Sequence, residues 1–204
     1  MLNNPEPKKK KLVLATGNAG KVQEMDSVLA DLGFEVISQR DLNVEDAIED
    51  GLSFVENSLI KSRHASRITG LPAVADDSGI SVDALNGAPG IYSARYAGDS
   101  CDDQANNDLL LENMRNVAET DRGIQFVCVL SYVRHAEDPM PLIAQGVWHG
   151  SLLFEERGTE GFGYDPLFWV PTHKLASAEL EPNVKRQISH RAKALELLCQ
   201  QLTK

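Results

Sequence analysis

Two adjacent carboxylates, Asp76 and Asp77, follow the short apolar run at residues 73–75 and precede Ser78 and Gly79. Carboxylate oxygens are ligands of divalent cations, and a positioned carboxylate can act as a general base. Catalytic groups of α/β proteins gather where strands end. The stretch therefore predicts a catalytic or metal-binding site at the end of a strand. Because Asp, Ser and Gly also form tight turns, an ordinary surface turn is the alternative interpretation.

A glycine-containing loop follows the strand predicted at residues 11–16 and leads into a helix whose apolar stripe runs over residues 22–32. Free N–H groups and the positive end of a helix dipole make such a loop suitable for phosphate. A hydroxyl, an amide and an ammonium group add to it here. The Walker spacing is absent, so a plain strand-to-helix turn is the competing interpretation. The candidate phosphate-binding residues are Thr16, Gly17, Asn18, Ala19, Gly20 and Lys21.

Lys61 lies on a helix that a capping box of Ser53 and Glu56 opens. The helix is predicted to extend to about Thr69, where Gly70 and Pro72 stop it. Most helix lysines are solvated, and that is the simplest interpretation of Lys61 alone. Acidic residues also crowd the preceding segment, residues 41–52, which predicts a solvated loop. The alternative is that one of these carboxylates shares a metal ion with the Asp76–Asp77 stretch.

The loop Gly158–Pro166 combines three glycines with two aromatic side chains and Asp165. Its aromatic residues either pack in a core or stack on a flat ligand ring, with Asp165 accepting hydrogen bonds from that ligand. Farther along, Ser189 is a candidate N-cap, followed at once by His190 and Arg191. Cations are disfavoured at a helix N-terminus, so we infer that a ligand or partner keeps these two side chains there.

The remaining elements alternate between strands and helices along the chain. A further helix is predicted over residues 102–118, where the Asp102–Asp103 pair suits the positive N-terminus and receives no catalytic role. Gly150 is expected to separate two antiparallel strands. Residues 1–10 are expected to form a flexible tail, and residues 11–204 a single domain. The other strands are predicted at residues 34–38, 125–133, 142–148, 151–154 and 167–170.

Composition restricts the class of protein. The 204 residues carry a net charge of −10, and 42% are hydrophobic. An acidic chain is a poor general binder of nucleic acid, so phosphate affinity must come from a few local cations and a metal ion. No apolar run approaches the ~20 residues of a membrane span. The three cysteines are far apart and odd in number, which indicates a reducing, cytoplasmic compartment.

Four motifs in this order resemble the inosine/xanthosine triphosphate pyrophosphatase family, and its bacterial members most closely. The resemblance covers about residues 11–202. It implies an α/β fold in which helices flank a long central mixed sheet, with two lobes and a nucleotide cleft between them. It also implies hydrolysis of dITP, ITP, XTP and dXTP to the monophosphate and pyrophosphate, with Mg²⁺, in a homodimer. The motifs are Thr16–Lys21, the helix from Phe54 to Lys61, Ala75–Gly79, and Gly161–Pro166 with Ser189–Arg191.

The resemblance also implies residue roles. Asp77 is the proton acceptor for water and a metal ligand, and Lys61 supplies positive charge. Many relatives carry a second metal carboxylate where this chain has Ile48, and we expect Glu49 to replace it, since the capping box accounts for Glu56. The loop Thr16–Lys21 is expected to cradle the triphosphate. The other substrate-binding residues are Ser78, Phe162, Gly163, Tyr164, Asp165, Lys185, His190 and Arg191.

The chemistry of the base agrees with these roles. Hypoxanthine and xanthine present a 6-oxo acceptor where adenine presents an amino donor, so donors from His190 and Arg191 would favour the deaminated bases. Two other classes stay open at this point. One is a related pyrophosphatase that acts on modified pyrimidines, as the Maf-like enzymes do. The other is a nucleotide-binding module without catalysis.

Overall fold

The structure is a computed structural model that describes residues 9–16 and 19–203. Most of the predicted N-terminal tail and the loop residues Gly17 and Asn18 lie outside the described residues. Seven strands form one mixed sheet in the order β2-β1-β3-β4-β5-β6-β7. Strand β1 pairs in parallel with β2 and β3, and the other neighbours are antiparallel. The strands are β1 (Lys10–Ala15), β2 (Phe34–Ser38), β3 (Ala73–Val82), β4 (Gly123–Val133), β5 (Leu142–Leu152), β6 (Phe168–Val170) and β7 (Leu175–Ala176).

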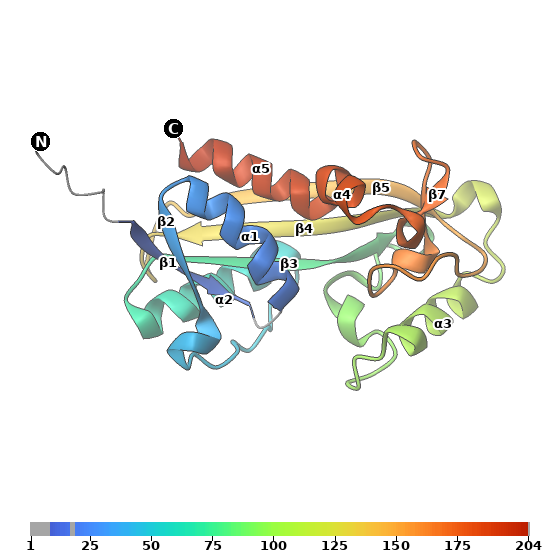
Figure 1. The fold of residues 1–204 in the computed structure, drawn as a ribbon. Coiled ribbons are helices and arrows are strands. Elements are labelled where there is room, and N and C mark those ends of the chain that lie inside the picture. The colour runs from blue at the N-terminus through green and yellow to red at the C-terminus, as the bar shows by residue number, and fades with distance from the viewer. Residues whose placement is uncertain (1–8, 17–18, 204) are drawn as a thin grey trace, which may run out of the picture.

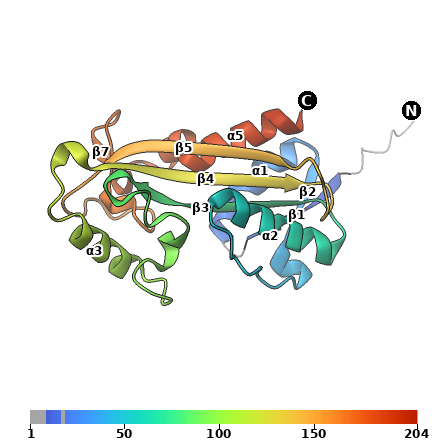
Figure 2. The same ribbon diagram turned by 180° about the vertical axis from the view of Figure 1, so that it is seen from behind.

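Helices cover both faces of this sheet, which confirms the expected α/β class with a long mixed sheet. Helices α1 and α5 lie on one face (Figure 1), and α2 lies on the other (Figure 2). Two apolar clusters match these layers, one joining α1 and α5 to the sheet and one centred on Ala65 of α2. Helix α3 lies at the opposite end of the long strands from α2, over a third cluster. The helices are α1 (Ala19–Asp31), α2 (Phe54–Thr69), α3 (Asp103–Asn113), α4 (Pro182–Ile188) and α5 (His190–Leu202).

The local signals that begin α2 and α5, and the one that ends α2, are confirmed. The Ser53 hydroxyl accepts the Glu56 N–H at 3.3 Å, and Gly70 ends α2 in the left-handed conformation. The Ser189 hydroxyl likewise accepts the Ala192 N–H, so His190 is the first residue of α5. Among the described residues, no helix is both long and apolar enough to cross a membrane.

The expected break at Asp76–Gly79 is wrong, because β3 continues without interruption from Ala73 to Val82. Antiparallel β4 supplies a ladder partner for every residue of β3, Asp77 opposite Val129 among them. A long pairing partner far along the chain thus outweighs the local turn propensity of Asp, Ser and Gly. The strand that ends here is β1, whose last partner on β3 is Ala75.

Two other expectations fail for similar reasons. Residues Leu142–Leu152 form one strand rather than two, and Gly150 lies inside it. A Cβ on Gly150 would come within 2.5 Å of the Trp169 carbonyl oxygen, so the glycine permits close approach of β6 rather than a turn. Helix α3 ends at Asn113, short of the predicted residue 118. There the buried Arg122 guanidinium donates to the Met114 carbonyl and satisfies the end of the helix.

Candidate active site

Side chains alternate between the two faces of β3, and this separates the adjacent carboxylates. Ala73 and Ala75 belong to the apolar cluster under α2, whereas Val74 belongs to the cluster under α1 and α5. Alternation therefore places Asp77 on the α2 face and Asp76 on the α1–α5 face. The Ser78 hydroxyl donates to Asp76 Oδ2 at 2.8 Å, as expected for residues two apart on one face. The two neighbouring aspartates thus have different surroundings and different partners.

Lys61 connects the helix, the acidic loop and the strand. Its Nζ lies 2.9 Å from Asp77 Oδ1 and 3.1 Å from Glu49 Oε2. Side-chain exposure is only 16% for Lys61 and 12% for Asp77. Burial works to lower the pKa of Lys61, but the carboxylates of Asp77, Asp76 and Glu49 outweigh it, so the pKa is raised. The lysine is therefore a fixed positive charge at the centre of this group.

Burial is also the main reason that the pKa of Asp77 lies above its ordinary value. The Lys61 charge opposes this shift, and the nearby carboxylates of Glu49 and Asp76 add to it. While Oδ1 faces the lysine, Asp77 Oδ2 is buried and has no hydrogen-bond partner among the described residues. Asp77 thus keeps one oxygen with capacity for a proton, a water or a cation.

The predicted second metal carboxylate, Glu49, shares a lysine with the first. Glu49 reaches Lys61, and through it the Asp77 side chain. Glu56 instead accepts the Leu52 N–H at 2.9 Å and the Ser53 hydroxyl at 2.7 Å, so the capping box uses it as expected. Ile48, at the position where relatives carry a carboxylate, points into solvent with 83% exposure. No group of three or more Asp, Glu, His or Cys in residues 9–16 and 19–203 is arranged to hold a metal ion.

The predicted phosphate loop leaves the sheet next to this group. Since Ala15 pairs with Ala75, Thr16 lies at the level of Asp76, where β3 extends beyond the end of β1. Thr16 is buried. Ala19, Gly20 and Lys21 form the first turn of α1, but the Lys21 side chain, like Gly17 and Asn18, lies outside the described residues.

The second group of predicted site residues surrounds Asp165, which is almost completely buried. One carboxylate oxygen accepts the Ser177 hydroxyl at 2.7 Å. The other accepts the Phe162 N–H at 2.9 Å and forms a close ion pair with Lys185. Asp165 is therefore saturated by partners within the protein. It holds Lys185 beside the Phe162 ring, 5.7 Å from the ring centroid.

Phe162 and Tyr164 belong to the same loop but have opposite environments. The Phe162 side chain is exposed at 60%, whereas Tyr164 is exposed at only 5%. The Tyr164 hydroxyl donates to the Ser93 carbonyl at 2.7 Å, and burial raises the pKa of this phenol. Tyr164 thus anchors the loop, and the ring left open for a flat ligand is that of Phe162.

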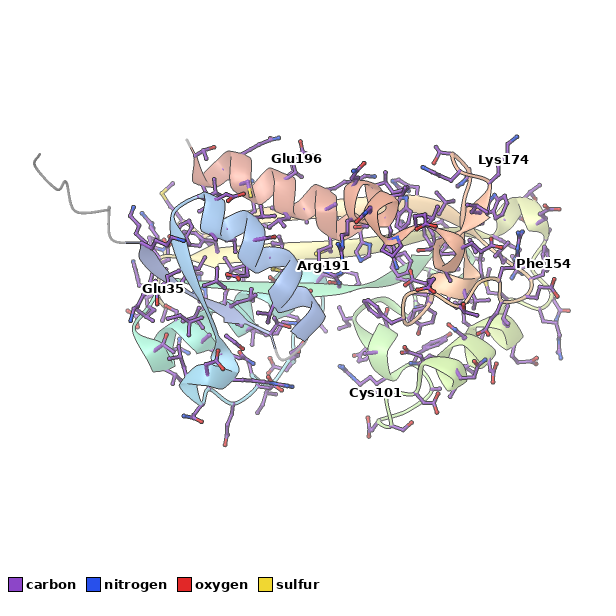
Figure 3. All side chains as sticks on the ribbon, in the orientation of Figure 1. Glu35, Cys101, Phe154, Lys174, Arg191 and Glu196 are labelled. Atoms are coloured by element: carbon purple, nitrogen blue, oxygen red, sulfur yellow. The ribbon has the colours of Figure 1, made fainter. Side chains whose placement is uncertain are left out.

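His190 and Arg191 begin α5 on the side that faces the sheet. Both are buried, and the His190 ring stacks on Phe126 of β4 at 4.8 Å between centroids and 9° between planes. Figure 3 shows Arg191 on the sheet side of α5, whereas Glu196 points away from the sheet. The helix therefore directs two nitrogen-bearing side chains inward, on the same face of the sheet as Asp76 and Ser78.

Sequence reasoning missed the residues that hold these groups in place. Ser93, Ser177 and Asn107 carry no catalytic signature, and Asp103 was explained by the helix dipole alone. Asp103 and Asn107 hydrogen-bond to Gly163 through a contact between α3 and the loop that the sequence does not indicate. A cavity of about 330 Å³ at the far side of α3 is lined by Arg122 and Phe154, with no predicted site residue.

Comparison with known proteins shows the family of the chain. The model of the Ham1 family matches residues 12–201. The dITP/XTP pyrophosphatase of Vibrio cholerae is 56% identical over 93% of this chain and 94% of its own length. That of Escherichia coli K12 is 54% identical, over 92% and 95%. The structure of a HAM1 protein from Coxiella burnetii superposes with a TM-score of 0.92 at 47% identity, covering 95% of this chain and 98% of that one. This chain belongs to the Ham1 family.

Proposed function

We propose that this protein hydrolyses the non-canonical purine nucleotides dITP, ITP, XTP and dXTP to the monophosphate and pyrophosphate, and so removes them from the nucleotide pool. The relatives named dITP/XTP pyrophosphatase are 54–56% identical over nearly the whole chain. The observation that carries the proposal is the Asp77–Lys61–Glu49 group beside the end of β1, where the predicted phosphate loop begins. A buried carboxylate and a buried ammonium group next to a predicted phosphate loop suit phosphoryl transfer, which needs charge neutralisation and an oriented nucleophile.

In this proposal Asp77 accepts the proton of the attacking water. Hydrolysis of a phosphoanhydride needs charge neutralisation and an oriented nucleophile more than a covalent intermediate. The buried position of Asp77 raises its pKa, which makes the carboxylate a better base than an exposed aspartate. The Lys61 charge opposes the rise in the pKa of Asp77 and favours its ionised form, and it places positive charge beside the phosphates. The β1 loop, with Thr16 and Lys21, holds the triphosphate.

The donor set fits Mg²⁺. Asp77 Oδ2 is a buried oxygen without a partner among the described residues, and the Glu49 carboxylate pairs with the same lysine, Lys61. Mg²⁺ prefers one or two carboxylates together with substrate phosphates and water, rather than a cage built only of protein ligands. When bound, the ion would neutralise charge on the phosphates and polarise the anhydride.

The base is proposed to lie at the other end of the site. The exposed Phe162 ring offers a stacking surface, and Lys185 beside it is fixed by Asp165. His190 and Arg191 provide nitrogen donors toward a 6-oxo group. Adenine has an amino group at that position and cannot accept from them. We also propose that the protein is a homodimer, which size-exclusion chromatography with light scattering can test. Its proposed compartment is the cytoplasm, and it is proposed to have no nucleic-acid partner.

A substrate panel tests this proposal. Wild-type protein with Mg²⁺ is assayed separately with dITP, XTP, dATP, dGTP, dTTP and UTP, and the phosphorus-containing products are identified by ³¹P NMR. We expect dITP and XTP to be preferred, with pyrophosphate released in one step. Preference for dTTP or UTP would favour a pyrimidine pyrophosphatase, and stepwise release of orthophosphate would contradict the reaction. Binding without turnover would leave only a nucleotide-binding module.

A further inference from the structure

Two side chains of helix α3 hydrogen-bond to the N–H and the carbonyl group of Gly163. The Gly163 N–H donates to Asp103 Oδ2 at 2.7 Å, and the Gly163 carbonyl accepts from Asn107 Nδ2 at 3.2 Å. Asp103 and Asn107 lie one turn apart and therefore share one face of the helix. Two side chains with opposite hydrogen-bonding roles thus match the N–H and the C=O of one loop residue.

The chemistry of Asn107 fixes the direction of its amide. Its Nδ2 also donates to Glu156 Oε1 at 2.9 Å. Both neighbours of this nitrogen are acceptors, so a flipped amide would turn its oxygen toward two oxygens. Asn107 is only 3% exposed, and a buried amide held in this way has little freedom. The same side chain therefore connects α3 to both ends of the segment from Glu156 to Gly163.

These hydrogen bonds from α3 hold the part of the loop that contains two glycines in the left-handed conformation. Gly163 has a φ of +60° and Gly161 a φ of +87°, conformations open to glycine but strained for other residues. Tyr164 is anchored on Ser93, and Asp165 on Ser177 and Lys185. No atom lies within 4 Å of the place where a Cβ on Gly163 would stand, so the backbone faces open space there. Fixing Gly163 fixes the exposed Phe162 ring next to it.

We infer that Asp103 and Asn107 are positioning residues that hold the Gly161–Asp165 loop, and with it the Phe162 ring, in the orientation that receives the base of the substrate. The inference rests on the proposed function. Neither residue need touch the substrate, because both act through the Gly163 peptide. Their loss should weaken recognition of the nucleobase and leave the phosphate end of the site, at Lys61 and Asp77, unaffected.

Asp103→Ala and Asp103→Asn in the full-length protein test this inference, with Asp102→Ala as matched control. Asp102 is the neighbouring carboxylate and caps α3 through the Ala105 N–H, but it has no contact with Gly163. Removing a charged acceptor should raise the KM for dITP roughly 5–20-fold in Asp103→Ala, with kcat changed less than about twofold. Asparagine keeps an acceptor oxygen and should restore most of the affinity. Asn107→Asp, which replaces the donor by an oxygen facing two acceptors, should resemble Asp103→Ala.

Two further readouts separate positioning from general damage. Inhibition by inorganic tripolyphosphate, which has no base, should keep its constant in Asp103→Ala. Exchange of the Gly163 amide hydrogen should become at least about tenfold faster in that variant and not in Asp102→Ala. An equal rise in KM for Asp102→Ala, an equal loss of tripolyphosphate affinity, or an unchanged KM would overturn the inference. Absence of dITP turnover in the wild type would instead reject the proposed function, and the amide exchange would still show whether α3 fixes Gly163.

Discussion

The proposed phosphate end and the proposed base end of this site each contain a buried aspartate paired with a lysine, but only one of the two aspartates has an oxygen without a partner among the described residues. Asp165 has partners on both oxygens. Asp77 has Lys61 on one oxygen and no partner among the described residues on the other. A saturated carboxylate can only hold its neighbours in place, whereas one with an open oxygen can take up a proton or a cation. Under the proposed function, Asp77 therefore takes the chemical role and Asp165 holds its neighbours in place.

The backbone differs in the same way. Asp77 projects from a regular strand and Lys61 from a regular helix. Such elements hold the two charged groups in a fixed relative position. Phe162 projects from a loop that needs two left-handed glycines and hydrogen bonds from its neighbours. Charge placement is thus built on secondary structure, and the surface for the base on an irregular segment held at several points.

The largest expected effect comes from Asp77→Asn. The amide keeps the shape of the carboxylate but cannot accept the proton from water, and a positioned base typically contributes ~10²–10⁴-fold. We expect kcat for dITP to fall by that factor, measured as pyrophosphate release from folded protein. Asp83→Asn, an exposed carboxylate just beyond the end of β3, serves as the control. An Asp77→Asn protein that keeps more than about a tenth of the activity would remove the distinction between the two aspartates.

The next effect is on selectivity and comes from Arg191→Ala. Loss of a charged donor to the 6-oxo group removes a hydrogen bond of ~1.5–3 kcal/mol that adenine cannot accept. The gap in kcat/KM between dITP and dATP should narrow by roughly 10–100-fold, mostly through a loss on dITP. Lys193→Ala, an exposed cation on the same helix, should leave the gap unchanged. A parallel loss on both substrates would mean that Arg191 contacts phosphate or stabilises α5.

A smaller change is expected from Phe162→Leu. Stacking of a base on an aromatic ring contributes ~1–3 kcal/mol, and the Phe162 ring has one open surface, so the KM for dITP should rise roughly 5–20-fold. Phe162→Tyr preserves the ring and should stay close to wild type. If Phe162→Leu has the wild-type KM for dITP, or if Phe162→Tyr raises the KM as much as Phe162→Leu does, the Phe162 side chain does not act by stacking.

In the protein without Mg²⁺, Glu49→Gln should produce the smallest effect, a downward shift in the pKa of Asp77. The Glu49 charge raises that pKa, and its removal also lets Lys61 interact more closely with Asp77. A carboxyl whose pKa is raised by folding stabilises the native state below its unfolded pKa, and that stability is lost as pH rises through the folded pKa. In Mg²⁺-free Glu49→Gln this loss should therefore be smaller.

The measurement is a ¹³C NMR titration of the Asp77 carboxyl, with Glu45→Gln as the control in the same acidic loop. An unchanged or higher pKa in Glu49→Gln would show that Glu49 does not act on Asp77. The acid limb of the pH–rate profile should move in the same direction as the titration.

Local rules predicted the elements whose causes are local. The capping box of Ser53 and the glycine at residue 70 located α2 correctly, because both act within one helical turn. The turn at Asp76–Gly79 was predicted wrongly because the pairing of β3 with β4 lies some 50 residues away in the chain. Gly150 was misinterpreted because its neighbour is the Trp169 carbonyl, again distant in sequence.

The candidate site follows the same division. Residue types singled out Asp77 and Asp165 as candidates, whereas Lys61 alone was interpreted as a solvated lysine and became a candidate through the family resemblance. Glu49 and Asp77 both contact Lys61, and their sharing of a metal ion stays a prediction. The hydrogen bond from Ser177 to Asp165 joins residues 12 positions apart. The hydrogen bond between Gly163 and Asp103 of α3 joins residues 60 positions apart. Positioning residues of this kind have ordinary side chains and become recognisable only in three dimensions.

The most direct test of the division between the two ends is the ratio of kcat/KM for dITP to that for dATP, measured at saturating Mg²⁺ in wild type, Asp77→Asn and Arg191→Ala. Asp77 should serve both substrates equally, so Asp77→Asn should lower both values by ~10²–10⁴-fold and leave their ratio within about twofold of wild type. Arg191→Ala should change the ratio by roughly 10–100-fold. A ratio that collapses in Asp77→Asn, or one that stays fixed in Arg191→Ala, would contradict the separation of chemistry from base recognition.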